Sequence, residues 1–149
     1  MILNQKDLLA ASPLEPMLIE KKKLHGVSHG LSEAGYDISI KQTVTLHPFR
    51  RFRLVSTIEH FTMPDNLLGI VHDKSTWARR GLSVFNTVIE PGWEGYLTAE
   101  LIYHGWRPLK IKAGSGIAQV IFHEVSTPVA YSGKYQNQAD MPVSAIMEG

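Results

Sequence analysis

The chain contains no cysteine among its 149 residues. Without thiols it cannot form disulfides, use a thiolate nucleophile or hold zinc through Cys ligands. Zinc-dependent base deaminases bind their metal with a His-x-Glu motif followed by a Cys-x-x-Cys pair, and the sequence has neither element. If this protein deaminates a base, it must therefore activate water without that zinc site.

Net charge and long apolar runs are also scarce. The formal net charge is +1 at pH 7, which gives no electrostatic reason to expect nucleic acid or an anionic membrane as partner. No apolar run approaches the roughly 20 residues of a membrane span, and Asp7, Pro13 and Pro16 interrupt any signal-peptide pattern. We therefore expect a soluble, cytoplasmic protein, whose local basic clusters could still bind a small anion such as a triphosphate.

The residues that are present suffice for one ordered domain. Hydrophobic residues make up 44% of the chain and charged residues 19%, and the length is that of an ordinary domain. Residues 131–149 are polar and include Pro142, which is typical of a tail rather than of a core. We expect a single domain over residues 1–149, with 131–149 as its C-terminal tail.

Short segments with alternating apolar residues, separated by Gly- and Pro-containing turns, dominate the rest of the chain. Strands are expected at 36–40, 51–58, 67–72, 82–89, 96–103, 109–111 and 117–125. A short helix is expected at 5–11, with Asn4 as a possible cap, whereas the Gly/Ser/His-rich stretch before residue 36 is expected to be a loop. Many short strands at this spacing favour a β-sandwich or β-barrel with little helix.

One segment, residues 73–81, breaks the strand pattern. It has cap-type residues at its start and Gly81 at its end, which predicts a helix of one to two turns. Ser75 and Arg79 are four residues apart and therefore share a helix face. A helix N-terminus suits a phosphate, and Lys74 adds a cation there. On spacing alone, a capped surface helix with exposed basic residues is the favoured interpretation.

Five ordered motifs change that interpretation. They are HDKSTWARRGL at 72–82, VIEPGWEG at 88–95, LTAEL at 97–101, AGSGIAQ at 113–119 and GKYQNQ at 133–138. In this order they resemble the motifs of the dCTP deaminase family, within the dCTP deaminase/dUTPase superfamily, and the similarity covers nearly the whole chain. The resemblance implies a mainly β fold, a distorted dUTPase-like β-barrel (β-clip) with a few short helices. It also implies a homotrimer with active sites between subunits.

The resemblance also implies the activity and the role of each matched residue. The reaction would be zinc-independent hydrolytic deamination of dCTP to dUTP and ammonia, with Mg²⁺ bound only through the substrate triphosphate. Glu100 would shuttle protons, while Ser75 and Arg79 would position the water and stabilise the site around carbon 4 of cytosine. The implied substrate-binding residues are Lys74, Gln119, Tyr131, Lys134 and Gln138 at the triphosphate, and Glu90 and Trp93 at the deoxyribose.

Strand periodicity supports the role of Glu100. Water attack on an amidine-like carbon needs a base that can pass its proton on, and a partly buried Glu can have a suitable pKa. Leu97, Ala99 and Leu101 alternate with Glu100, which places Glu100 on the opposite face of its strand. An arbitrary strand Glu is more often simply solvent-exposed. The Ser75/Arg79 pair and the family resemblance favour catalysis instead.

Two departures from the family pattern leave alternatives open. The acid at the sugar position is usually Asp, whereas here it is Glu90, and the hairpin over residues 81–90, which reads the base, is slightly shorter than usual. The alternatives are a pyrophosphatase of the same fold, acting on dUTP, dCTP or a modified pyrimidine, and a bifunctional enzyme. A non-catalytic nucleotide-binding protein is a third possibility. Trp77 and Trp106 are expected to be core or subunit-interface aromatics.

Overall fold

The computed structural model describes residues 1–149, and strands make up most of its regular structure. In chain order the elements are α1 (Gln5–Ala11), β1 (Leu14–Glu15), β2 (Lys22–Leu24), β3 (Val27–Ser32), β4 (Gly35–Ser39), β5 (Val44–Leu46), β6 (Phe52–Thr62), β7 (Leu67–Asp73), α2 (Ser75–Ala78), β8 (Leu82–Val84), β9 (Val88–Ile89), β10 (Glu94–Tyr103), β11 (Leu109–Ile111) and β12 (Gly116–Glu124). The predicted mainly β fold with a few short helices is confirmed.

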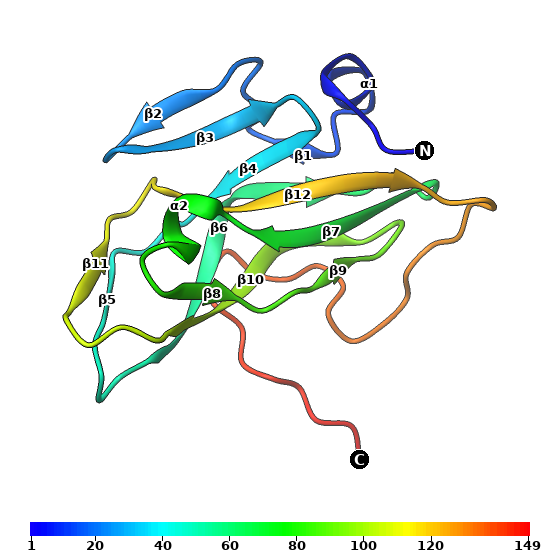
Figure 1. The fold of residues 1–149 in the computed structure, drawn as a ribbon. Helices are drawn as coiled ribbons and strands as arrows, with labels where there is room; N and C mark the ends of the chain where they lie inside the picture. The colour runs from blue at the N-terminus through cyan, green and yellow to red at the C-terminus, as the bar shows by residue number, and fades with distance from the viewer.

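Two larger sheets and one ribbon make up the fold. One sheet has the strand order β2-β3-β4-β12-β7-β9, the other β1-β6-β10-β8, and β11 pairs with β5. Figure 1 shows β12 and β7 forming a layer over β8 and β10, with the β5/β11 ribbon along one side. A bridge between Ile40 and Thr57 joins the end of β4 to β6. The sheets therefore wrap around a shared interior as a distorted barrel.

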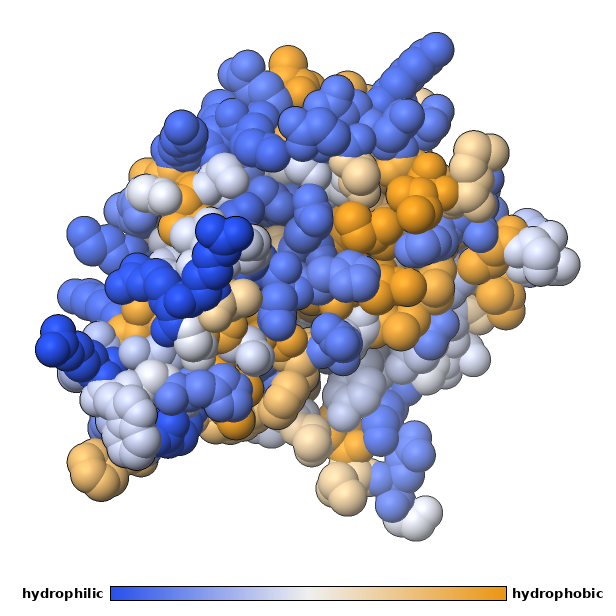
Figure 2. Space-filling view, in the orientation of Figure 1, coloured by the Kyte–Doolittle hydropathy of each residue, from blue (hydrophilic) through white to orange (hydrophobic).

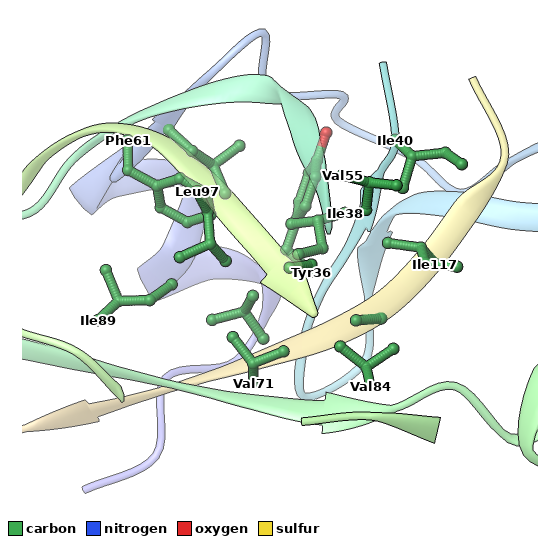
Figure 3. Close-up of a cluster of buried hydrophobic side chains, with 14 of the residues drawn as sticks. Tyr36, Ile38, Ile40, Val55, Phe61, Val71, Val84, Ile89, Leu97 and Ile117 are labelled. Atoms are coloured by element: carbon green, nitrogen blue, oxygen red, sulfur yellow. The ribbon is translucent and has the colours of Figure 1, made fainter. Parts of the chain in front are cut away.

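The interior follows from the period-two pattern of the strands. Tyr36, Ile38 and Ile40 alternate along and just beyond β4, and their side chains face Val55 and Leu97 of the opposite sheet (Figure 3). All the buried hydrophobic side chains form one cluster. Because a continuous core is the mark of a single domain, these residues form one cooperative unit.

The segment at residues 82–89 is not the single strand that its sequence predicts. It divides into β8 and β9 because the chain passes from one sheet to the other. The Phe85 N–H donates to the carbonyl of Glu100 on β10 over 3.0 Å, whereas the Thr87 carbonyl accepts from Val71 on β7, also over 3.0 Å. The alternating pattern is continuous, but the pairing partner changes within three residues.

The predicted loop before residue 36 is also wrong, because it contains the β2–β3 hairpin. Its small residues conceal the strand pattern, but they are required by close packing. Gly30 has φ +100°, and a Cβ atom there would lie 2.7 Å from the Glu20 carbonyl oxygen. Only glycine tolerates both conditions.

The two tryptophans expected in the core or at an interface differ. Trp77 of α2 is buried and donates its indole N–H to the Gly116 carbonyl over 2.6 Å, as expected of a core residue. Trp106 is 82% exposed in this chain, so a place in the core is wrong. The Arg51 guanidinium carbon lies 5.5 Å from the Trp106 ring centroid. Neither helix is long and apolar enough to cross a membrane.

Candidate active site

A cavity of about 300 Å³ opens between β9, β10 and the C-terminal residues. Its lining is formed by Thr87, Val88, Ile89, Glu90, Trp93, Leu97, Thr98, Glu100, Tyr131, Tyr135, Gln138 and Val143. Half of the residues predicted for the site are among them: Glu90, Trp93, Glu100, Tyr131 and Gln138. The strand alternation that placed Glu100 in the site also extends to Thr98, two residues earlier on β10, which the motifs did not single out.

Glu100 lies on the face of β10 opposite its core residues. Ala99 and Leu101 are buried in the core, and Glu100 is half-buried at the cavity, so the predicted orientation is confirmed. Burial raises the pKa of Glu100 above its ordinary value of 4.5, and only a backbone hydrogen bond opposes this effect. With no side-chain donor or cation beside it, the carboxyl is suited to exchanging protons rather than to a permanent ion pair.

The turn between β9 and β10 fixes the wall of the cavity. Trp93 is 5% exposed, and its indole N–H donates to the Tyr135 carbonyl over 2.7 Å. Its backbone N–H donates to the Glu90 carbonyl, and its carbonyl accepts from Met63. The ring is therefore held rigidly, whereas Glu90 is exposed at the rim.

Residues 131–138 pack along the start of β10. The Gln136 side chain accepts from the Glu94 N–H over 2.7 Å and donates to the Gly92 carbonyl over 2.9 Å. Gly95 forms a parallel bridge with Gln138, and a Cβ atom at Gly95 would lie 2.5 Å from the Gln138 nitrogen. The Oε1 atom of Gln138 is buried without a hydrogen-bond partner. Since such an acceptor is costly when unpaired, a bound ligand is a natural donor for it.

A second group of predicted residues lies at the other end of the six-stranded sheet. Lys74 donates to the Asp37 carboxylate over 2.5 Å, and the two side chains are 11% and 4% exposed. On β12, Gln119 lies directly opposite Asp37 on one side and His72 on the other. Opposite residues point to the same face, so these side chains form one polar row beside α2.

Ser75 and Arg79 lie on α2 next to this row. Both are exposed, and neither side chain makes a hydrogen bond or ion pair within the chain. α2 has a single turn, and its N-cap residue Lys74 makes no side-chain capping bond. The helix therefore presents a hydroxyl and a guanidinium that nothing in the chain engages.

The two groups do not meet in one chain. Glu90 follows β9, which pairs with β7 at Gly69, whereas Ser75 follows the far end of β7. Six residues of extended chain separate Gly69 from Ser75, which is about 20 Å. Lys74, Ser75, Arg79, Gln119 and Lys134 all lie outside the cavity lining. One chain thus supplies two incomplete halves of the predicted site.

Comparison with known proteins gives the family. Residues 19–125, more than half of the chain, match the dCTP deaminase-like family. The chain belongs to this family. The dCTP deaminase of Herpetosiphon aurantiacus is 37% identical over 89% of this chain and 90% of its own. That of Campylobacter curvus is 37% identical over 82% and 83%, and that of Nitrosomonas eutropha 34% over 90% and 89%.

Solved structures of similar fold are dUTPases. A mutant dUTPase from phage phi11 of S. aureus, described with a structural Mg(II) ion, has a TM-score of 0.58 at 18% identity, covering 80% of this chain and 92% of its own. The native EIAV dUTPase has a TM-score of 0.57 at 20% identity, covering 76% and 90%. At these identities the likeness establishes the fold, which is the dUTPase-like barrel predicted from the motifs.

Proposed function

We propose that this protein is a zinc-independent dCTP deaminase, which hydrolyses dCTP to dUTP and ammonia. The observation that carries the proposal is Glu100, a half-buried carboxyl at the cavity whose pKa is raised by burial and which no side chain neutralises. The curated relatives are named for this reaction. No three His, Asp or Glu side chains converge to form a metal site, so the donor set supports water activation by a carboxylate.

In the proposed reaction Glu100 accepts a proton from a water molecule as the water oxygen bonds to carbon 4 of cytosine. Glu100 passes this proton to ring nitrogen 3, which makes carbon 4 tetrahedral. The second proton of the attacking water then reaches the amino group through Glu100, and the bond between carbon 4 and that nitrogen breaks. The sum is dCTP plus water giving dUTP plus ammonia. A raised pKa suits this role because the carboxyl must both take and release protons near neutral pH.

Ser75 and Arg79 of a second copy complete the site in this proposal. Both are exposed and unengaged in their own chain, about 20 Å along β7 from the rim at Glu90. An assembly that places α2 of one copy over the cavity of the next supplies a hydroxyl to hold the water and a guanidinium to stabilise charge. Head-to-tail contacts of this kind close into rings, and we propose a homotrimer.

An exposed apolar row supports an interface between copies. Ile121 on β12 lies opposite Ile70 on β7, which lies opposite Val88 on β9. Their side chains face outward, and Val88 is 49% exposed. Figure 2 shows a hydrophobic patch on this face of the molecule. Adjoining apolar side chains on an outer sheet face are typical of a surface that is covered in the assembled protein.

The triphosphate in this proposal contacts both halves of the site. Lys74 and Gln119 come from the polar row, and Lys134 and Gln138 come from the C-terminal residues. A magnesium ion would be carried by the phosphate oxygens, as is usual for Mg²⁺ at nucleotide sites, because the chain offers no cluster of carboxylates to hold it. Tyr131 packs against the core beside the cavity and would close residues 131–138 over the phosphates.

The sugar in this proposal lies against Trp93 with Glu90 at the rim. The fixed indole ring gives a flat apolar wall that would disfavour a 2′-hydroxyl, because burying an unpaired hydroxyl is costly. The prediction is a preference for dCTP over CTP. Replacing Trp93 by Leu should reduce this preference if the ring itself excludes the hydroxyl.

A second candidate, a nucleotide pyrophosphatase, is favoured by one observation. Glu90 and Glu100 line the same cavity, so a second carboxylate is available to orient a water toward the α-phosphate. The test is to incubate the protein with dCTP and, separately, with dUTP in the presence of Mg²⁺, and to separate the products by ion-exchange chromatography. Ammonia and dUTP are expected from dCTP. Release of pyrophosphate from either nucleotide would instead support the second candidate or a bifunctional enzyme.

A further inference from the structure

The last ten residues, 140–149, lie against the nucleotide cavity although they follow all the matched motifs. Val143 is part of the cavity lining, and its backbone N–H donates to the Thr98 hydroxyl over 3.0 Å. Thr98 is two residues from Glu100 on β10. The segment therefore reaches the part of the cavity in which the base-modifying carboxyl lies.

Acidic side chains attach the same segment to lysines. Glu148 approaches Lys134, with 3.6 Å between its Oε1 and the lysine Nζ, and Asp140 pairs with Lys41. Lys134 is the residue assigned to the triphosphate. A glutamate carboxylate and a phosphate oxygen are both anions that bind an ammonium group, so Glu148 occupies the position that the substrate's charge would take.

The segment is held weakly. Ile146 donates its N–H to the Tyr135 hydroxyl over 3.0 Å, but Met141 is 58% exposed and Met147 86% exposed. Little apolar surface is thus buried, and exposed ion pairs contribute little stability. Residues 131–138, by contrast, are tied to β10 and its preceding turn by several backbone and amide hydrogen bonds.

We propose that residues 140–149 are a competing strap, which occupies the nucleotide cavity in the free protein and leaves it when the triphosphate binds. This inference rests on the proposed nucleotide site and assigns it a form of regulation. Residues 131–138 bind the substrate, and the strap opposes binding by holding Lys134 and the space beside Thr98. Removing an attachment of the strap should therefore strengthen nucleotide binding, which is the opposite of the usual effect of losing a contact.

The first test is Glu148→Gln in the full-length chain, with Glu33→Gln as the matched control. Glu33 forms a similar exposed pair with Lys21, at 3.3 Å, away from the cavity. Loss of an exposed pair corresponds to roughly a two- to fivefold change in an equilibrium constant. The Kd of dCTP and of inorganic tripolyphosphate should fall by this factor in Glu148→Gln and stay constant in Glu33→Gln. An unchanged or higher Kd in Glu148→Gln would overturn the strap.

Tripolyphosphate separates this inference from the proposed reaction. It has no base, so it reports on Lys134 even if the protein proves not to deaminate dCTP. Tighter tripolyphosphate binding without dCTP turnover would retain the strap and reject the reaction. Normal turnover without any change in either Kd would do the reverse.

The second test follows the segment directly. Because the chain has no cysteine, Ser144→Cys gives a unique site for a nitroxide label, and Ser126→Cys gives an exposed control outside the strap. Saturating dCTP should sharpen the spectrum of the label at 144 as the strap is released, and leave that at 126 unchanged. A label at 144 that becomes more immobile with nucleotide would show a clamp that closes, and would overturn the proposal.

Discussion

The cavity and the α2 end of the molecule differ in how completely their side chains are satisfied. At the cavity, Trp93 and Gln136 are fixed by hydrogen bonds, and the unpaired groups are acceptors or acids such as Gln138 Oε1 and Glu100. At the α2 end the unpaired groups are donors. No arginine of the chain forms an ion pair, and the arginines lie in α2 or in turns next to the end of β10: Arg50, Arg51, Arg53, Arg79, Arg80 and Arg107.

This difference indicates why neither region is a complete site. A carboxyl that exchanges protons needs a partner to stabilise the charge that develops at the base, and the cavity has no cation in contact with Glu100. α2 supplies such a cation but no cavity. Complementary halves on one chain are what a ring of identical copies requires, because each copy offers both.

The largest expected effect separates the two carboxylates of the cavity. Glu100→Gln keeps the shape of the side chain but cannot accept the water's proton, so deamination of dCTP should fall by about 10²–10⁴-fold. Nucleotide affinity, measured by calorimetry, should change little because other residues hold the triphosphate. Glu90→Gln serves as the control and should retain most of the turnover. If instead Glu90→Gln is the more damaging change and pyrophosphate is the product lost, the second candidate function is correct.

Mixing two inactive variants tests whether the halves belong to different copies. Glu100→Gln and Arg79→Ala should each be nearly inactive as pure proteins. If a site combines Glu100 of one copy with Arg79 of the next, random mixing regenerates about one intact site in four. Activity should therefore return to about a quarter of the wild-type level after subunit exchange, measured as dUTP formed per site. A mixture that stays inactive after verified exchange would place both residues in one chain's site.

Sequence reasoning found the chemistry of both halves but not their separation. Alternation along β10 was enough to place Glu100 opposite the core, because that rule is local. The passage of residues 85–87 from one sheet to the other was not predictable, since it depends on whether Val71 or Glu100 supplies the hydrogen bond. The strap escaped for the same reason: nothing in its composition shows that Val143 meets Thr98, some 45 residues away in the chain.

Lys134 provides a smaller test of the comparison, within the cavity half. A hydrogen bond to a charged group contributes about 1.5–3 kcal/mol, so Lys134→Ala should raise the Kd of dCTP by roughly 10- to 100-fold. Lys112→Ala removes an exposed lysine that does not line the cavity and serves as the control. The Kd of deoxycytidine, which lacks phosphates, should not change in either variant. Equal losses for deoxycytidine and dCTP would mean that Lys134 supports the fold of the cavity rather than the triphosphate.

The pH dependence of the reaction tests the environment of Glu100. Burial raises the pKa of Glu100 above 4.5, and a general base must be ionised to act. The value of kcat/KM should therefore fall as the pH drops through this raised pKa, giving an acid limb above pH 4.5. Residual activity of Glu100→Gln should lack that limb. A profile that is flat down to pH 4.5 in the wild type would contradict the role of Glu100 as base.

The smallest expected effect concerns Glu59, a buried carboxyl of the fold rather than of the cavity. Its two oxygens accept from the backbone N–H and the hydroxyl of Ser39, at 2.8 to 3.2 Å, and it is 2% exposed. Burial is the largest influence on its pKa, which is raised, although the bonds from Ser39 oppose the change. Glu59 thus shares the direction of the shift with Glu100 but has the partners that Glu100 lacks.

The sign of the stability effect follows from the raised pKa of Glu59. Between 4.5 and that raised value the folded state binds more protons than the unfolded state, so the free energy of unfolding falls as the pH rises through this window. Each pKa unit between the two states corresponds to about 1.4 kcal/mol. Glu59→Gln cannot ionise but keeps an oxygen to accept from Ser39, so its unfolding free energy should decline less than that of the wild type over the same window. Urea unfolding at a series of pH values and one protein concentration measures this, with Glu100→Gln as the comparison. Parallel curves for wild type and Glu59→Gln would mean that the Ser39 bonds fully offset the burial of Glu59, while Glu59→Gln should in either case leave the acid limb of kcat/KM in place, because that limb belongs to the cavity.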